Sequence, residues 1–184
     1  FVLDEVQTGV GLTGTPWAYQ QLGLEPDVVA FSKKLQVGGI MAGRRVDDVP
    51  DNVFAVSGRI NSTWGGGLVD MVRSTRLLEI IEQRGYIAQA AETGAWFLAQ
   101  LEQLVGRQPL ADNARGRGLM VAFDLPDRGV RDDVLSRLRT EERVLLLPCG
   151  DVSIRFRPAL PIGRADLETG LAAVDRVLSS AGTA

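Results

Sequence analysis

Residues 1–34 of the chain read FVLDEVQTGVGLTGTPWAYQQLGLEPDVVAFSKK, and this stretch decides the class of fold. Residues 1–6 form a short apolar run that ends in acidic residues, which predicts a strand buried in a parallel sheet. A glycine-rich loop over 8–14 and a short helix over 16–23 follow, the helix having proline in its first turn and glycine at its end. Residues 27–31 predict a second buried strand. Strands that alternate with a helix indicate an α/β domain with a mainly parallel sheet.

The pattern changes near residue 84. A long helix is expected over 68–84, because apolar residues recur there at helical spacing. Beyond it the sequence predicts helices at 86–105, 130–139 and 164–179 and strands at 119–125, 144–147 and 152–156. We therefore expect two domains, residues 1–83 being the C-terminal part of a large domain with its linking helix, and residues 84–184 a small α+β domain. Because the chain opens inside a strand pattern without methionine, we expect a piece of a longer protein.

Composition narrows the chemistry that the chain can carry. It has 184 residues, a net charge of −3 and no histidine, which excludes histidine metal sites and serine–histidine–aspartate triads within this segment. The charge balance gives no indication of nucleic-acid binding, and no apolar run is long enough to span a membrane. Cys149 is the single cysteine, which fits a reducing, cytoplasmic compartment. We accordingly expect no metal ion, nucleic acid or membrane as a partner.

Asp4 and Lys33 each stand at the carboxyl end of a predicted parallel strand, the edge at which open α/β sheets bind ligands. An amine and an acid at one edge suit a site for pyridoxal 5'-phosphate (PLP), in which a lysine forms an imine with the cofactor aldehyde and an acid bonds to the pyridine nitrogen. Lys33 and Lys34 are the only lysines. The alternative is that both are solvated loop lysines and that the Asp4-Glu5 pair caps a helix.

The run Gly9-Val10-Gly11-Leu12-Thr13-Gly14 fits the G-x-G-x-x-G spacing of dinucleotide-binding loops. Two features speak against that reading. The helix over 16–23 has only about two turns, where a full crossover helix is needed. The next strand ends in lysines rather than in the acid that binds a ribose hydroxyl. Basic residues can accept the additional phosphate of NADP, so an NADP-binding oxidoreductase stays open as a remote alternative.

Two further groups are suited to anions. Thr63-Trp64-Gly65-Gly66-Gly67 leads into the helix over 68–84, and a hydroxyl with glycines at a helix N-terminus suits a phosphate, although a plain N-cap region has the same pattern. Arg155 and Arg157 alternate along the strand over 152–156 and so share a face. Arginine binds a carboxylate through two parallel hydrogen bonds. The alternative is a surface strand with solvated arginines.

Taken together, these motifs resemble those of the class III (subgroup II) aminotransferases. Residues 3–14 resemble the first signature of that family, and residues 25–33, EPDVVAFSK, resemble the second, in which the cofactor lysine lies six residues after the aspartate of a Pro-Asp pair. Residues 115–120, RGRGLM, and 155–160, RFRPAL, resemble motifs of its small domain. The resemblance implies part of a PLP enzyme of fold type I, which is a homodimer with active sites at the subunit interface.

The resemblance also implies roles for individual residues. Asp4 pairs with the pyridine nitrogen, Gln7 contacts the cofactor's ring hydroxyl, and Lys33 forms the internal aldimine. Thr63 reaches the phosphate of the neighbouring subunit's cofactor. Arg155 holds the α-carboxylate of glutamate or 2-oxoglutarate.

Three segments indicate a branch of the family. Residues 33–47, KKLQVGGIMAGRRVD, with DNVF at 51–54 and NSTWGG at 61–66, resemble the lysine branch, whose members move the ε-amino group of L-lysine to 2-oxoglutarate and give 2-aminoadipate 6-semialdehyde and glutamate. Asn61 is then expected on the substrate side of the pocket. The ornithine and 4-aminobutyrate branches share the cofactor contacts and are the nearer alternative. By itself the segment is expected to be inactive, because the remaining cofactor-binding groups are expected upstream.

Overall fold

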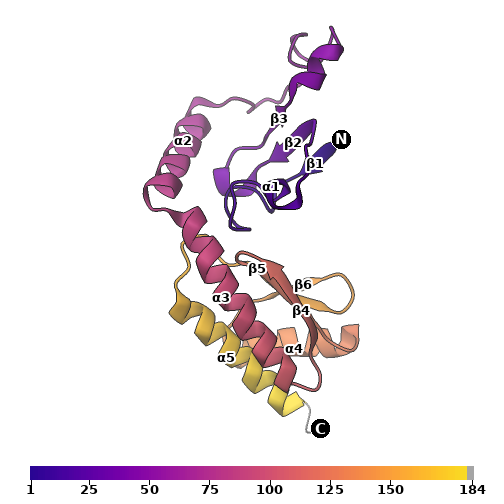
Figure 1. Ribbon diagram of the computed structural model, residues 1–184, viewed down its shortest axis with the longest axis vertical. Helices are drawn as coiled ribbons and strands as arrows, with labels where there is room; N and C mark the ends of the chain where they lie inside the picture. Colours follow the sequence, from indigo (N-terminus) through magenta and orange to yellow (C-terminus); the bar gives the residue numbers. More distant parts are fainter. Residues whose placement is uncertain (182–184) are drawn as a thin grey trace. The chain divides into compact units, whose positions relative to one another are not determined.

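The computed structural model describes residues 1–181, and these cluster into two compact units, each traced in Figure 1. The first unit comprises Phe1–Gly11 with Thr15–Gly85, and the second comprises Leu12–Gly14 with the chain from Tyr86 onward. Across this described part of the chain, no helix has both the length and the apolar character needed to cross a membrane.

The first unit is built on a three-stranded sheet in the order β1-β2-β3. Its elements are β1 (Val2–Asp4), α1 (Tyr19–Leu22), β2 (Val28–Phe31), η1 (Lys33–Leu35), β3 (Gly39–Ala42), η2 (Arg44–Asp48) and α2 (Leu68–Gln83). Strands β1 and β2 are parallel, with Leu3 opposite Val29. The parallel pair expected from the sequence is therefore confirmed, although both strands are shorter than predicted.

The third strand makes this sheet mixed, because β3 runs antiparallel to β2. Only residues 32–38 separate the two strands, and a parallel crossover needs about a dozen residues or more. Gly39 lies opposite Phe31, and a Cβ on Gly39 would stand 2.7 Å from the Phe31 ring. A larger residue at this position would therefore displace that ring.

Much of the apolar surface of the first unit is exposed in the single chain. Val2 on β1 is 66% exposed, because β1 is an edge strand that pairs only with β2 among the described strands. On α2, Leu68, Val69 and Val72 are 83%, 77% and 70% exposed, and Ser74 is the buried residue of that helix. The burial predicted for the strand over residues 1–6 is therefore not found at Val2 in the described chain.

The second unit combines a four-stranded antiparallel sheet, in the order β4-β5-β7-β6, with three helices. Its elements are α3 (Tyr86–Arg107), β4 (Asp112–Arg117), β5 (Met120–Asp124), α4 (Arg128–Thr140), β6 (Leu147–Cys149), β7 (Ser153–Phe156) and α5 (Arg164–Ala181). In its core the buried ring of Phe97 on α3 meets Phe156 on β7 edge to face, with 5.0 Å between the ring centroids. The three helices predicted for this region are confirmed.

Two strand predictions in the second unit are wrong. The sequence does not predict β4, because DNARGR is polar throughout; the strand forms at an edge of the sheet, where it pairs only with β5. The strand expected over 144–147 lies instead at Leu147–Cys149. Pro148 is tolerated there because β6 is the other edge strand and need not donate a hydrogen bond on its outer side.

The turn between β4 and β5 explains the last glycine of the RGRGLM run. Gly118 has a φ of +54°, and a Cβ on it would lie 2.4 Å from the carbonyl carbon of Thr13. The amide of Leu119 donates a hydrogen bond to the carbonyl oxygen of Leu12 at 2.9 Å. This close approach of two backbones is why Leu12–Gly14 packs with the second unit.

A polar cluster links three strands of this sheet. Asp124 on β5 accepts hydrogen bonds from Ser153 Oγ at 2.5 Å and from Asn113 Nδ2 at 2.7 Å, and it pairs with Arg115 Nη2 at 2.9 Å. Partial burial by itself raises the pKa of Asp124. The hydrogen bonds from Ser153, Asn113 and Arg115, together with the charge of that arginine, outweigh burial and hold the pKa of this carboxyl below its usual value.

The cluster predicts an acid-sensitive contribution to stability. Because the pKa of Asp124 is lower in the folded than in the unfolded chain, its carboxylate stabilises the fold above about pH 4, and this contribution is lost as the pH falls through the folded-state pKa. We expect Asp124→Asn to lower the free energy of unfolding at pH 7 and to differ less from wild type at each step from about pH 5 to pH 2. Urea unfolding at several pH values measures this, with exposed Asp151→Asn as control. A difference that stays constant over this range contradicts the assignment.

Candidate active site

The parallel pairing of β1 and β2 brings an acid and an amine to one edge of the first sheet. Asp4 is the last residue of β1 and lies opposite Ala30, and Lys33 opens η1 just after β2 ends. Both side chains are exposed. Asp4 Oδ1 accepts a hydrogen bond from the amide of Val6 at 2.9 Å, which fixes the carboxylate and leaves it further acceptor capacity.

Gln7 is the residue that joins the two strand ends. Lys33 Nζ donates to Gln7 Oε1 at 2.9 Å, and Lys34 Nζ donates to the main-chain oxygen of Gln7 at 2.7 Å. The remaining amide atom, Gln7 Nε2, is buried and has no hydrogen-bond partner among the described residues. A buried donor of this kind costs free energy unless an acceptor is supplied, so the site fits a bound group that carries an acceptor atom.

The backbone around Lys33 is held in an uncommon conformation. Lys33 has a φ of +37° and Gln36 a φ of +55°, both in the left-handed region that disfavours side chains. Leu35 is buried between them, and Arg73 Nη2 of α2 donates to the carbonyl oxygen of Gln36 at 3.1 Å. Helix α2 therefore holds the turn that carries the two lysines, and strained backbone of this kind gathers at functional sites.

Glu5 is a structural member of the site that sequence reasoning misses. Its carboxylate is buried, at 4% exposed, and accepts hydrogen bonds from Thr8 Oγ1 and from the amide of Tyr19, the latter at 2.8 Å. Successive strand residues point to opposite faces, so Glu5 turns inward while Asp4 turns out. This alternation along the strand is the sequence feature that indicates an inward-facing Glu5. The buried carboxylate fastens the loop that follows β1 and carries Gln7.

Asn61 and Thr63 lie in the exposed segment that leads into α2. The N-cap of α2 is Gly67, so residues 63–67 do form the N-cap region of the alternative interpretation, although no side chain caps the helix. Neither Asn61 nor Thr63 makes a side-chain hydrogen bond to any residue between 1 and 181. In the single chain, then, the structure does not bring these two residues into contact with Lys33.

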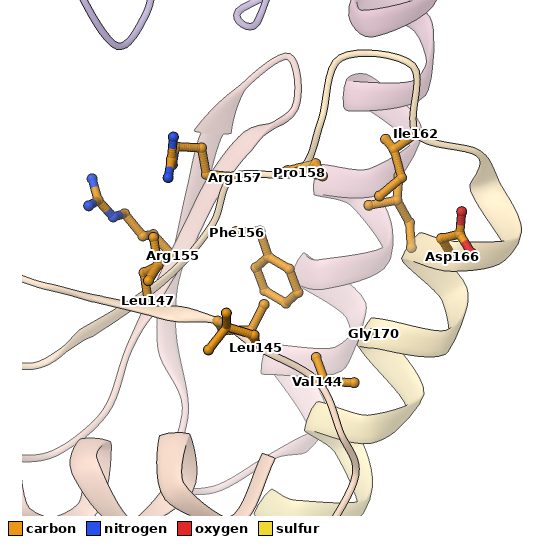
Figure 2. Close-up of a pocket in the computed structure, with 12 residues that line it drawn as sticks. Val144, Leu145, Leu147, Arg155, Phe156, Arg157, Pro158, Ile162, Asp166 and Gly170 are labelled. Carbon is orange, nitrogen blue, oxygen red and sulfur yellow. The ribbon is translucent and has the colours of Figure 1, made fainter. Parts of the chain in front are cut away.

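Arg155 belongs to the second unit, where it lies in the middle of β7. It lines a cavity of about 340 Å³ together with Leu145, Phe156 and Ile162. Figure 2 shows the guanidinium groups of Arg155 and Arg157 on one side of this strand and the Phe156 ring on the other, as the strand alternation predicts. Arg155 Nε is buried and has no hydrogen-bond partner within the described residues, so this guanidinium is available to bind an anion.

The glycine-rich run at 9–14 does not open a crossover helix. The helix that follows, α1, has four residues and ends at Gly23, whose φ is +63°. Its one turn lacks the length of a dinucleotide-binding unit, which speaks against the NADP alternative. Residues 1–181 also contain no group of three or more histidine, cysteine, aspartate or glutamate side chains arranged to hold a metal ion.

Residues 1–178 match the family model described as "Aminotransferase class-III". The chain belongs to the class-III aminotransferases. The family predicted from the sequence motifs is thereby confirmed. PLP is the cofactor of class-III aminotransferases, and the buried, unpartnered Nε2 of Gln7 beside Lys33 is consistent with that cofactor.

Among relatives of this class-III aminotransferase chain, an L-lysine-epsilon aminotransferase of Streptomyces clavuligerus is 58% identical over 175 residues, which are 95% of this chain and 38% of that protein. A structure of the M. tuberculosis lysine aminotransferase in its internal aldimine form superposes with a TM-score of 0.92 at 51% identity, covering 97% of this chain and 41% of that one. A 4-aminobutyrate aminotransferase of Sus scrofa is 37% identical, covering 87% of this chain and 31% of that protein. The chain thus spans about two-fifths or less of the length of these relatives.

Proposed function

We propose that the longer protein containing this chain transfers the ε-amino group of L-lysine to 2-oxoglutarate, giving 2-aminoadipate 6-semialdehyde and glutamate. The observation that carries the aminotransferase chemistry is the edge where Lys33 Nζ meets Gln7 Oε1 beside Asp4. The choice of lysine as amino donor rests on similarity, because identity to a lysine enzyme is 58% and identity to a 4-aminobutyrate enzyme is 37%. Ornithine- or 4-aminobutyrate-type activity is the alternative.

PLP, when bound, supplies an aldehyde that takes up amino groups and a pyridine ring that withdraws electrons. Lys33 would hold the aldehyde carbon of the cofactor through Nζ. When free, the Lys33 amine would take the proton from the substrate carbon that bears the amine and pass it on to the cofactor carbon. The exposed position of Lys33 at the sheet edge leaves its amine accessible for both tasks.

Asp4 and Gln7 would both hold the ring of the cofactor. The Asp4 carboxylate, fixed by the Val6 amide, would accept a hydrogen bond from the protonated pyridine nitrogen and so favour the protonated ring. Gln7 Nε2, which is buried and lacks a partner in the described chain, would donate a hydrogen bond to the hydroxyl oxygen of the ring. The Asp4 carboxylate thus has a hydrogen-bond donor as its partner, and Gln7 Nε2 has an acceptor.

Arg155 binds the α-carboxylate of 2-oxoglutarate or glutamate. Its Nε is buried without a partner among the described residues, and a carboxylate satisfies a guanidinium through two parallel hydrogen bonds. Asn61 is proposed to line the substrate side of the pocket. We further propose that residues 1–83 complete a large domain and that residues 84–184 form the small domain that carries Arg155.

A second copy of the protein is proposed to cover the exposed face of α2 and to use Thr63. Trp64, Leu68 and Val69 are 85%, 83% and 77% exposed and follow directly after Thr63, and an apolar surface of this kind indicates an interface. In such a cytoplasmic homodimer Thr63 donates its hydroxyl to the phosphate of the neighbouring subunit's cofactor, which accounts for its lack of a hydrogen bond within one chain.

The proposed reaction predicts a preference among amino donors. With 2-oxoglutarate as acceptor, the full-length enzyme is expected to use L-lysine with a kcat/KM at least about tenfold above those for L-ornithine and 4-aminobutyrate, since one methylene group is worth roughly 10- to 200-fold in a fitted pocket. Glutamate formation measures this. A higher value for ornithine or 4-aminobutyrate contradicts the lysine assignment but not the aminotransferase chemistry.

The same assay tests Arg155. Arg155→Lys keeps the charge but loses the two-pronged hydrogen bonding, so the KM for 2-oxoglutarate is expected to rise about 10- to 100-fold. Exposed Arg128→Lys is the control and should leave that KM unchanged. An unchanged KM in Arg155→Lys removes the residue from the acceptor site.

The shared active site is tested with mixed dimers. Thr63→Val subunits and Lys33→Ala subunits are each expected to be impaired, the first by weaker cofactor binding of about tenfold or more. If Thr63 serves the neighbouring subunit, a dimer of one Thr63→Val and one Lys33→Ala chain contains one complete site and should show about half the activity of the native dimer. Activity of the mixed dimer no higher than that of the Thr63→Val subunit alone would mean that Thr63 acts within its own chain.

A further inference from the structure

Two consecutive lysines contact one glutamine at two different atoms. Lys33 Nζ donates to the side-chain oxygen of Gln7 at 2.9 Å, and Lys34 Nζ donates to its main-chain oxygen at 2.7 Å. The second bond is partly buried and joins positions 27 residues apart in the sequence. A charged donor to a carbonyl makes one of the stronger protein hydrogen bonds, so Lys34 is a fixed member of this edge and not a solvated side chain.

The turn η1 makes this double contact possible. The left-handed φ of +37° at Lys33 opens the turn, Leu35 is buried beneath it, and Arg73 Nη2 ties Gln36 to α2 at 3.1 Å. With both ends of the turn held, Lys33 and Lys34 both reach Gln7. While the Lys33 amine is free it engages the amide oxygen of Gln7, and Nε2 is the buried amide atom without a partner among the described residues.

We propose that Lys34 is a positioning residue that acts through Gln7. Its ammonium group fixes the main chain of Gln7, so that the side-chain amide presents Nε2 to the ring oxygen of the cofactor. The inference rests on the proposed function, since it needs PLP at this edge. It assigns a task to the lysine that does not carry the cofactor.

Other charged groups surround the same edge and set the background for any pH measurement. They are Asp4 on β1, Glu5 in its buried bonds to Thr8 and Tyr19, Lys33 on η1, and Arg73 with its partner Asp70 on α2. Because all of these stay in place when Lys34 alone is changed, a shift seen in a Lys34 variant reports on Lys34 and on the residue that it holds.

The test is a pH titration of the visible absorbance of the full-length holoenzyme. A ring oxygen that loses a hydrogen-bond donor holds the proton that it shares with the Lys33 nitrogen more tightly, so the absorbance change moves to higher pH. Gln7→Leu and Lys34→Met are each expected to raise the midpoint by about 0.5–1 pH unit. Lys34→Arg keeps a charged donor, so its midpoint should stay close to that of wild type. Arg76→Met, at an exposed ion pair with Glu79, is the control and should titrate as wild type.

The double variant separates positioning from a through-space effect of charge. If Lys34 acts through Gln7, Gln7→Leu combined with Lys34→Met shifts the midpoint no further than Gln7→Leu alone, to within about 0.3 pH unit. A wild-type midpoint in Lys34→Met, or a double shift equal to the sum of the single shifts, overturns the proposal. Should Lys34→Met not retain the cofactor, Lys34→Gln carries the same titration. If the wild-type full-length protein shows no visible PLP band, the proposed function itself is contradicted.

Discussion

The hydrogen bond from Lys33 Nζ to Gln7 Oε1, at 2.9 Å, is the interaction on which the candidate site depends. It joins the segment after β1 to the segment after β2, and only a parallel pairing of these strands brings both segments to one edge. Three supports hold it in place. Glu5 fastens the loop after β1, Lys34 binds the Gln7 carbonyl, and Arg73 ties down the end of η1. Within this arrangement Gln7 Nε2 is buried and has no hydrogen-bond partner among the described residues.

The same constraint explains why so little of the site lies in regular structure. Lys33 and Gln36 both have positive φ, which a regular α-helix or strand does not allow, and they lie at the start and just past the end of η1, a single 3-10 turn between β2 and β3. Such backbone is costly unless its surroundings hold it. The buried Leu35 and the contact from α2 supply that support, so the helix after Thr63 has a structural task in addition to its exposed apolar face.

Local pattern was enough to predict some of these features and not others. The alternation of apolar runs with glycine-rich loops indicated the parallel pair and hence the meeting of Asp4 and Lys33 at one edge. It did not reveal that Glu5 binds the amide of Tyr19 or that Lys34 contacts Gln7, since both contacts join separate parts of the chain. Strand β4 was not predictable because its residues are polar and it depends on pairing with β5 and on contact with α3. The antiparallel direction of β3 follows from the short connection over residues 32–38 and not from a local pattern. An amphipathic helix is normally buried on its apolar face, but the apolar face of α2 is exposed because no described part of the chain packs against it.

The central claim is that Lys33, and not its neighbour, carries the cofactor at the edge it shares with Asp4. Borohydride reduction of the full-length holoenzyme, followed by proteolysis and mass mapping, addresses it directly, since reduction makes the link between lysine and PLP permanent. The account predicts that the pyridoxyl mass is found on Lys33 and that reduction abolishes the visible band. A pyridoxyl group on Lys34, on a lysine elsewhere in the longer protein, or on no residue at all would contradict it.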